Sequence, residues 1–279
     1  MNQIERGQGH RMVTLQTEYF SLEQICVSGQ CFRMQPLENG RYQVIAGDRY
    51  LEAWQEGDRT VFDCTEDEFE TFWKDYFDLD TDYGAYIGRI NPNDRYLVTA
   101  ANCGQGVRIL RQDLWEMIVT FLISQQNNIR RIRRCIDLIC KNYGEAMISR
   151  NGTSYYAFPA PEAFAGLEEN ALMACNLGYR SKYVIRTAEQ ILGGQTDLDR
   201  IRMLPYSGAR KELLELFGVG EKVADCICLF ALHHLQAFPV DTHIRQVLEQ
   251  HYKKGFPNRR YRDCRGVMQQ YIFYYELQR

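Results

Sequence analysis

The spacing of hydrophobic and polar residues changes near residue 106, and this change separates two kinds of secondary structure. Before it, short apolar runs are divided by the pairs Asn39-Gly40, Gly47-Asp48 and Gly57-Asp58, which favour tight hairpins. This pattern is typical of an antiparallel meander. The predicted strands cover residues 31–35, 41–46, 49–55 and 60–62.

A helix is predicted to follow the last of these strands. Thr65 and Glu68 have the spacing of a capping box, in which each side chain bonds the other residue's backbone N–H. Large aromatic residues then recur at helical spacing. They are Phe69, Phe72, Trp73 and Tyr76.

From about Gly106 onward the apolar residues recur with helical period. Helices are predicted over residues 114–124, 127–142, 168–177, 181–192, 210–216, 222–235 and 266–277. The fold class is therefore α+β. We expect an N-terminal antiparallel β-sheet domain over 1–107, followed by a mostly α-helical domain over 108–279 whose last helix packs back toward the N-terminal domain.

Composition and charge narrow the function classes. Hydrophobic residues make up 45% and charged residues 25% of the chain, which is ordinary for a folded soluble protein. No apolar run reaches the about 18 residues that span a membrane, so we expect a cytoplasmic monomer without membrane contact. The net charge is −3, and DNA binding would therefore need a local basic patch. One such patch contains Arg130, Arg131, Arg133 and Arg134.

The ten cysteines are predicted to be reduced thiols. A disulfide framework is typical of short secreted chains, whereas this chain is long and begins with polar residues. After residue 200 only Cys226, Cys228 and Cys264 remain, too few for the four-cysteine site of an iron–sulfur cluster or a structural zinc. We expect no cofactor and no catalytic metal.

The segment 213–225 is the most informative part of the sequence. A helix ends, Gly218 and Gly220 flank Val219, and a second helix begins. Glycines permit a tight turn, and the free N–H groups at the start of the second helix can bind a phosphate. The pattern fits a helix-hairpin-helix over about 210–235, which grips a DNA backbone, or a simple corner between two helices.

Lys222, in this segment, and Asp241, beyond it, are the candidate catalytic residues. Lys222 lies in the first turn of its helix, where the helix dipole disfavours a cation, and an uncharged lysine amine can form a Schiff base. Helical spacing places Lys222, Cys226, Leu229 and His233 on one face. Asp241 follows Pro239-Val240 at the start of another helix, where an aspartate is usually an N-cap.

Five segments together resemble the 8-oxoguanine DNA glycosylase/AP lyase family within the helix-hairpin-helix glycosylases. They are residues 28–33, 106–113, 124–129, 177–180 and 218–243. The resemblance implies a bifunctional enzyme that excises 8-oxoguanine and ring-opened purines from duplex DNA and then cuts the strand by β-elimination. The implied partner is double-stranded DNA with an oxidised purine opposite cytosine.

The resemblance also implies roles for single residues. Lys222 matches the nucleophile that attacks the sugar, and Asp241 matches the carboxylate that supports the positive charge on the sugar. The residues that match damaged-base contacts are Gly29, Cys226, Gln269 and Phe273. Read without the resemblance, Gly29 would be a turn glycine, and Cys226 and Phe273 would be core residues.

A further set matches contacts to the DNA backbone and to the opposite base. Its members are Asn127, Arg131, Tyr179, Arg180, Gly218, Gly220 and His243. Tyr179 matches a wedge, and the arginine forks can bond a base edge. The sequence departs from the common eukaryotic pattern at Gln126, where that pattern has asparagine. The family also implies a structural cation at the backbone carbonyls of Leu214, Leu216 and Val219.

Two alternatives to the bifunctional enzyme remain. A monofunctional glycosylase for alkylated bases or mispaired adenine uses water as nucleophile and does not need Lys222. A non-catalytic DNA-binding module would use the hairpin only to hold the backbone, and Asp241 would then have no chemical role.

Overall fold

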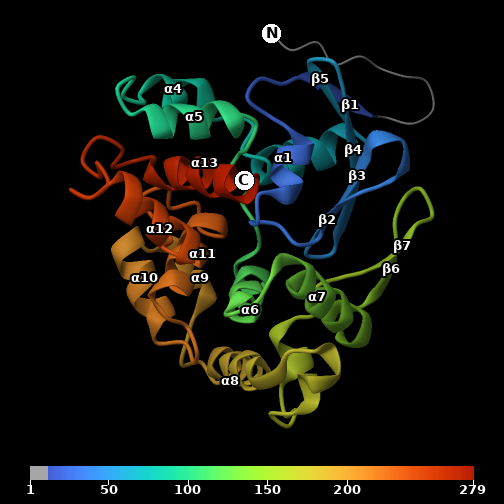
Figure 1. The fold of residues 1–279 in the computed structure, drawn as a ribbon. Coiled ribbons are helices and arrows are strands. Elements are labelled where there is room, and N and C mark those ends of the chain that lie inside the picture. Colours follow the sequence, from blue (N-terminus) through green and yellow to red (C-terminus); the bar gives the residue numbers. More distant parts are fainter. Residues whose placement is uncertain (1–11) are drawn as a thin grey trace. The chain divides into compact units, whose positions relative to one another are not determined.

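The computed structural model describes residues 12–279 (Figure 1). These residues form two compact units. Unit 1 contains the described residues up to Val44, then Leu51–Arg111 and Leu235–Arg279. Unit 2 contains Ile45–Tyr50 and Gln112–His234. The chain returns to unit 1 after residue 234, so the two units alternate along the sequence.

An antiparallel sheet carries the N-terminal part of the chain, as the sequence predicts. It contains β1 (Val13–Gln16), β2 (Met34–Pro36), β3 (Arg41–Ala46), β4 (Arg49–Glu56) and β5 (Arg59–Phe62) in the order β1-β5-β4-β3-β2. Its pairing register places Val13 opposite Phe62 and Met34 opposite Val44, and all four side chains are buried. Strand β1 was not predicted, and β2 begins at Met34 rather than Cys31.

The other elements of unit 1 include short helices that the sequence analysis missed. They are α1 (Leu22–Val27), α4 (Tyr83–Gly88) and α5 (Arg95–Cys103), besides a 3-10 turn, Glu38–Gly40. The predicted capping box is present at Thr65 and Glu68. It begins a continuous run of α2 (Glu66–Glu68), a π-helical turn (Phe69–Trp73) and α3 (Lys74–Tyr76).

Two C-terminal helices complete unit 1. They are α12 (Thr242–His251) and α13 (Arg265–Leu277), and α13 packs against both α5 and α12 (Figure 1). The C-terminal helix thus packs on an element from the N-terminal half of the chain. Val267, Met268, Tyr271 and Ile272 of α13 are fully buried.

Unit 2 is mostly helical and is built around α6 (Leu114–Ser124), whose residues from Leu114 to Ile123 are all buried. Such an all-round apolar helix is typical of a core position. The other elements of unit 2 are α7 (Ile129–Tyr143), β6 (Ala146–Ile148), β7 (Ser154–Tyr156), α8 (Ser181–Leu192), α9 (Leu198–Met203), α10 (Tyr206–Leu214), α11 (Glu221–Phe230) and 3-10 turns at Pro161–Phe164, Ala171–Cys175 and Gly178–Arg180.

Two of the predicted helices differ from the observed ones. The segment 168–177 forms only the 3-10 turn Ala171–Cys175, which Asn176 ends in the left-handed conformation (φ 61°). The helix expected over 222–235 ends at Phe230. His233 lies beyond it with φ 53°, so the prediction that His233 shares a helix face with Lys222 was wrong. None of the helices within residues 12–279 has the length and apolar character needed to cross a bilayer.

A buried arginine organises the part of unit 1 that leads into α6. The side chain of Arg108 is 5% exposed, and its guanidinium donates hydrogen bonds to four backbone carbonyls. These belong to Glu18, Tyr19, Asp78 and Thr81, at 2.7–3.1 Å. Arg108 also lies 4.5 Å from the ring centroid of Tyr83, and burial lowers the pKa of its guanidinium.

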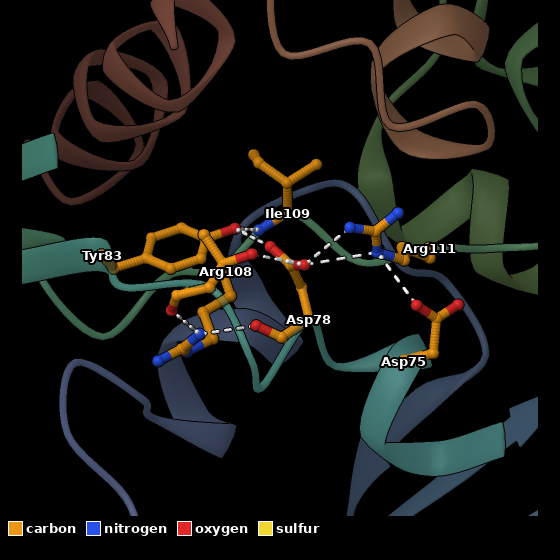
Figure 2. Close-up of polar contacts among 7 residues, drawn as sticks. Asp75, Asp78, Tyr83, Arg108, Ile109 and Arg111 are labelled. Atoms are coloured by element: carbon orange, nitrogen blue, oxygen red, sulfur yellow. Dashed lines mark hydrogen bonds and ion pairs between the residues drawn. The ribbon is translucent and has the colours of Figure 1, made fainter. Parts of the chain in front are cut away.

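Asp78 is the second centre of this network, as Figure 2 shows. Its carboxylate accepts hydrogen bonds from the Tyr83 hydroxyl (3.0 Å), the Thr81 hydroxyl (2.9 Å) and the Arg111 guanidinium (3.0 Å). The Tyr83 hydroxyl also accepts the Ile109 N–H (2.8 Å), and burial raises the pKa of Tyr83 well above its ordinary value. Charged and polar contacts therefore fix the segment 108–111, in addition to the packing of the buried Ile109 and Leu110.

We predict that Arg108→Met destabilises the protein strongly. The substitution removes a buried guanidinium that donates to four carbonyls, and polar groups left unpaired in this way cost enough to lower the free energy of unfolding by about 3 kcal/mol. Urea denaturation measures this change. The control is Arg200→Met, which removes a largely exposed ion pair with Glu212 (2.8 Å) and is expected to cost less than about 1 kcal/mol. Equal losses in the two variants would contradict the role of Arg108.

Candidate active site and nucleic-acid interface

The turn between α10 and α11 is tight and is held by side chains of unit 2. Gly218 has φ 88°, and a methyl group at this position would lie 2.6 Å from Cγ of Tyr183. The amide of Gln125 donates to the carbonyl of Gly218 (3.1 Å), and the side chain of Gln190 accepts the N–H of Phe217 (2.8 Å). Only glycine fits position 218, because the turn combines a left-handed conformation with close contact to a ring.

The start of α11 has the features of a phosphate-binding helix end. Gly220 is its N-cap and supplies no side-chain hydrogen bond. Gly220 and Glu221 are exposed, so the first N–H groups of α11 are open to a ligand. This agrees with the helix-hairpin-helix expected from the sequence. The predicted cation site at Leu214, Leu216 and Val219 stays a prediction; within it, the carbonyl of Leu216 accepts the N–H of Val219 (3.1 Å).

Lys222 is the second residue of α11 and is half-buried. Its Nζ lies 5.4 Å from the ring centroid of Phe121 in α6. That ring stacks on Phe230, with centroids 5.5 Å apart and planes at 16°. Cys226, one turn further along α11, is buried. Lys222 therefore projects over an aromatic surface, which limits its access to water.

Asp225 attaches α11 to α10 by charge. Asp225 accepts hydrogen bonds from the Arg210 guanidinium (2.8 Å) and the Tyr206 hydroxyl (2.7 Å). The buried thiol of Cys228 lies near Asp225, and burial raises the pKa of this thiol. This attachment fixes the rotation of α11 about its axis.

Arg180 organises the loop that precedes α7. Its guanidinium is 3% exposed and donates to the carbonyls of Gln125 (2.8 Å), Gln126 (2.9 Å) and Leu177 (3.2 Å). Gln126 has the left-handed φ of 47°. Arg180 therefore supports the loop carrying Gln126 and Asn127, and these carbonyl bonds compete with any bond from Arg180 to a base.

Tyr179 extends this cluster to the surface. It is 46% exposed, its ring lies 4.5 Å from the Arg180 guanidinium carbon, and it meets Tyr183 edge-on at 5.7 Å. Tyr183 also contacts Gly218. The ring of Tyr183 therefore connects Tyr179, the predicted wedge, to the turn of the hairpin. Neither Tyr183 nor Phe121 was identified from the sequence, although Tyr183 lies one helical turn after Tyr179.

The remaining opposite-base candidates lie at the start of α7. The amide of Asn127 donates to the carbonyl of Ile123 (3.0 Å). Asn128 caps α7 by accepting the N–H of Arg131 (2.9 Å). Arg131 is exposed and donates to the carbonyl of Asn176 (3.3 Å). Unit 2 thus brings together the predicted hairpin, nucleophile and opposite-base residues.

Unit 1 contains the other predicted site residues, and Gly29 and Phe273 are in direct contact. Gly29 has φ 75°, and a methyl group there would lie only 2.8 Å from Cε1 of Phe273. His243 meets the Phe273 ring edge-on, with centroids 6.2 Å apart. Gln269, one turn before Phe273, is buried and donates to the carbonyl of Pro239 (3.2 Å). Residues far apart in the sequence therefore meet around one aromatic ring.

Asp241 is the N-cap of α12, and its carboxylate accepts the N–H of Ile244 (2.8 Å). The structure thus confirms the N-cap interpretation. It leaves room for a second role, because a carboxylate offers about four acceptor positions and Asp241 is only half-buried. His243, two residues later, is exposed.

Comparison with known proteins agrees with both parts of this description. Residues 12–118 match the family model described as 8-oxoguanine DNA glycosylase, N-terminal domain. Residues 119–260 match the model described as HhH-GPD superfamily base excision DNA repair protein. The chain therefore belongs to the HhH-GPD superfamily of base excision DNA repair proteins and carries the N-terminal domain of the 8-oxoguanine DNA glycosylases.

Individual relatives support this membership. The chain is 32% identical over 206 residues to the N-glycosylase/DNA lyase of Saccharomyces cerevisiae, a match of 69% of this chain and 54% of that protein. It is 32% identical to a probable N-glycosylase/DNA lyase of Methanothermobacter thermautotrophicus, over 64% of this chain and 66% of that one. The aligned part thus covers about half to two thirds of these relatives' own lengths.

A solved structure resembles nearly the whole chain. It is Clostridium acetobutylicum 8-oxoguanine glycosylase/lyase in complex with double-stranded DNA containing cytosine opposite 8-oxoguanine. The identity is 34%, the TM-score is 0.91, and the alignment covers 99% of this chain and 98% of that one.

We predict that Gly29→Ala is more harmful than Gly40→Ala, although both glycines have nearly the same φ (75° and 73°). The left-handed backbone costs either alanine about 1 kcal/mol. At Gly29 the contact with Phe273 adds a further ~1–3 kcal/mol, whereas nothing lies within 4 Å at Gly40. Urea denaturation of the two variants measures the difference. Equal unfolding free energies would mean that Gly29 and Phe273 are not in close contact.

Proposed function

We propose that this protein is a bifunctional DNA glycosylase/lyase that excises 8-oxoguanine and ring-opened purines from duplex DNA. The observation that carries the proposal is the position of Lys222, in the first turn of the second hairpin helix and over the ring of Phe121. A lysine at the mouth of a DNA-gripping hairpin combines substrate binding with a nucleophile. The names of the aligned relatives, N-glycosylase/DNA lyases, support the same activity.

In the proposed reaction the uncharged amine of Lys222 attacks C1′ of the damaged nucleotide. The glycosidic C–N bond breaks, and the base leaves with the bonding electrons and takes up a proton. The nitrogen loses a proton and forms a double bond to C1′ as the C1′–O4′ bond breaks and O4′ takes up a proton, which gives a protonated Schiff base with the opened sugar. Removal of a C2′ proton then expels the 3′ phosphate, which cuts the strand.

Asp241 supplies the negative charge that this reaction requires. Positive charge develops on the sugar as the base departs, and a fixed carboxylate stabilises that charge. One oxygen of the Asp241 carboxylate accepts the N-cap hydrogen bond from Ile244, and this bond fixes the direction of the side chain. We infer that Asp241 also accepts the proton that Lys222 loses.

The proposed base-recognition residues are Gly29, Phe273, Gln269 and Cys226. The carbonyl of Gly29 would accept the N7–H that 8-oxoguanine has and guanine lacks. The Phe273 ring would stack on the base face, and the buried amide of Gln269 would bond its edge. Extrusion of the base costs a few kcal/mol, least for a weakened pair.

On the other strand, we propose that Tyr179 inserts into the stack and that Asn127, Arg131 and Arg180 bond the unpaired cytosine. Arg180 would have to exchange carbonyl bonds to Gln125 and Gln126 for bonds to the base. The cytosine in the clostridial complex supports this preference. The first N–H groups of α11 and His243 would hold backbone phosphates, and the protein would act as a monomer.

Lys222 distinguishes this proposal from the two alternatives. A monofunctional glycosylase forms no covalent bond to the sugar, and a DNA-binding module releases no base.

We predict that borohydride traps a protein–DNA adduct on a duplex containing 8-oxoguanine and that Lys222→Gln abolishes the adduct. Base release should fall more than about a thousandfold, because a nucleophile is lost. Lys211→Gln, an exposed lysine on α10, is the control that should still form the adduct. Undiminished base release by Lys222→Gln would refute the nucleophile.

We predict that Asp241→Asn slows base release about a hundredfold or more, as loss of an electrostatic contact in the transition state does. Asparagine caps helices as well as aspartate, so the melting temperature and duplex binding should stay close to wild type. The matched control is Asp197→Asn, which alters an exposed N-cap that accepts the Arg200 N–H (3.0 Å). Unchanged single-turnover base release by Asp241→Asn would exclude an electrostatic role for its charge.

A further inference from the structure

The segment that joins α12 to α13, together with the first residue of α13, is strongly basic in a protein whose net charge is −3. We call residues 252–265 the basic loop. It contains a single acidic residue, Asp263, among six cationic ones. These are Lys253, Lys254, Arg259, Arg260, Arg262 and Arg265.

Aromatic side chains fix the inner side of the basic loop. Phe256 and Tyr261 are buried, and their ring centroids lie 5.7 Å apart. Phe256 also packs against Tyr252 (5.2 Å) and Phe238 (4.8 Å). The Tyr261 hydroxyl accepts the N–H of Asn91 (3.1 Å). The loop therefore has a core of its own and keeps a defined shape.

Arg89 neutralises the acidic residue of the loop. Its guanidinium forms two hydrogen bonds to the Asp263 carboxylate (2.7 and 2.8 Å) and a third to the carbonyl of Arg260 (3.1 Å). Arg260 donates in return to the carbonyl of Arg89 (3.0 Å). The two hydrogen bonds from Arg89 lower the pKa of Asp263. Because Asp263 is occupied by Arg89, it does not neutralise the other cations of the loop.

The outer side of the loop presents cations without partners. Four side chains are exposed and have neither an ion pair nor a hydrogen bond to any other described residue. They are Lys253, Lys254, Arg259 and Arg262. Many exposed cations in proteins are merely solvated, but four of them on one rigid loop create a concentrated positive potential.

The basic loop packs on the segment that leads to Asp241. Phe256 contacts Phe238, three residues before Asp241. At the end of the loop, Arg265 donates to the carbonyl of Gln236, and the N–H of Gly266 bonds the carbonyl of Leu235 (2.8 Å). A nucleic acid bound at Asp241 and His243 would therefore pass close to the loop.

We propose that the basic loop is a second contact surface for the phosphate backbone of duplex DNA, flanking the damaged nucleotide. This inference rests on the proposed function, because it takes DNA to be the substrate. Lysines and arginines bind phosphates without reading the base sequence. A rigid loop loses little conformational entropy on binding, so these contacts would increase affinity for any duplex.

The test is the salt dependence of binding to an undamaged duplex. The variant Lys253→Gln/Lys254→Gln/Arg259→Gln/Arg262→Gln should reduce the slope of log K against log salt concentration by about 2–3, because each lost phosphate contact accounts for about 0.9. The charge-preserving variant Lys253→Arg/Lys254→Arg/Arg259→Lys/Arg262→Lys should keep the wild-type slope. Thermal melting of both variants establishes that they fold.

A matched control distinguishes the effect of the basic loop on the slope from the effect of a lower net charge. Arg41→Gln/Lys74→Gln/Arg200→Gln/Arg279→Gln removes four cations that are all ion-paired to carboxylates, and it should leave the slope near wild type. An unchanged slope in the loop variant, or an equal change in the control, would overturn the proposal. Borohydride trapping with wild-type protein tests the proposed function separately, since the slope is measured without any cleavage.

Discussion

The turn from Gly218 to Gly220 determines where the proposed nucleophile is placed. Its backbone lies so close to the ring of Tyr183 that a side chain at position 218 would collide with it. The same turn starts α11 without a capping side chain and leaves N–H groups free for a phosphate. Lys222 follows two residues later. The proposed phosphate site and the position of the proposed nucleophile thus follow from one backbone conformation.

Polar contacts, rather than apolar packing alone, fix the orientation of the site elements. Arg210 and Tyr206 hold Asp225 and so fix the rotation of α11. Arg180 holds the carbonyls of the loop before α7. In unit 1, Gln269 bonds Pro239 and Asp241 caps α12. Buried hydrogen bonds are directional and costly to leave unmade, so they define side-chain positions more narrowly than hydrophobic contacts do.

Much of the fold and the site was predictable from local sequence patterns. The hairpin strands, α6, the capping box at Thr65 and the start of α11 all follow from short-range periodicity or turn chemistry. Strand β1 and the short helices α4 and α5 depend on partners distant in the sequence, and so local patterns missed them. His233 was misplaced because the chain leaves the helix at Ala231 without a proline or glycine to signal the end. The contact of Gly29 with Phe273 could not come from spacing either.

In the proposed mechanism one lysine performs both base release and strand cleavage. The most direct measurement is peptide mapping by mass spectrometry of the adduct that borohydride traps on a duplex with 8-oxoguanine opposite cytosine. We expect the sugar remnant to be attached to Nζ of Lys222. Attachment to another amine, or efficient base release with no adduct on any peptide, would contradict it.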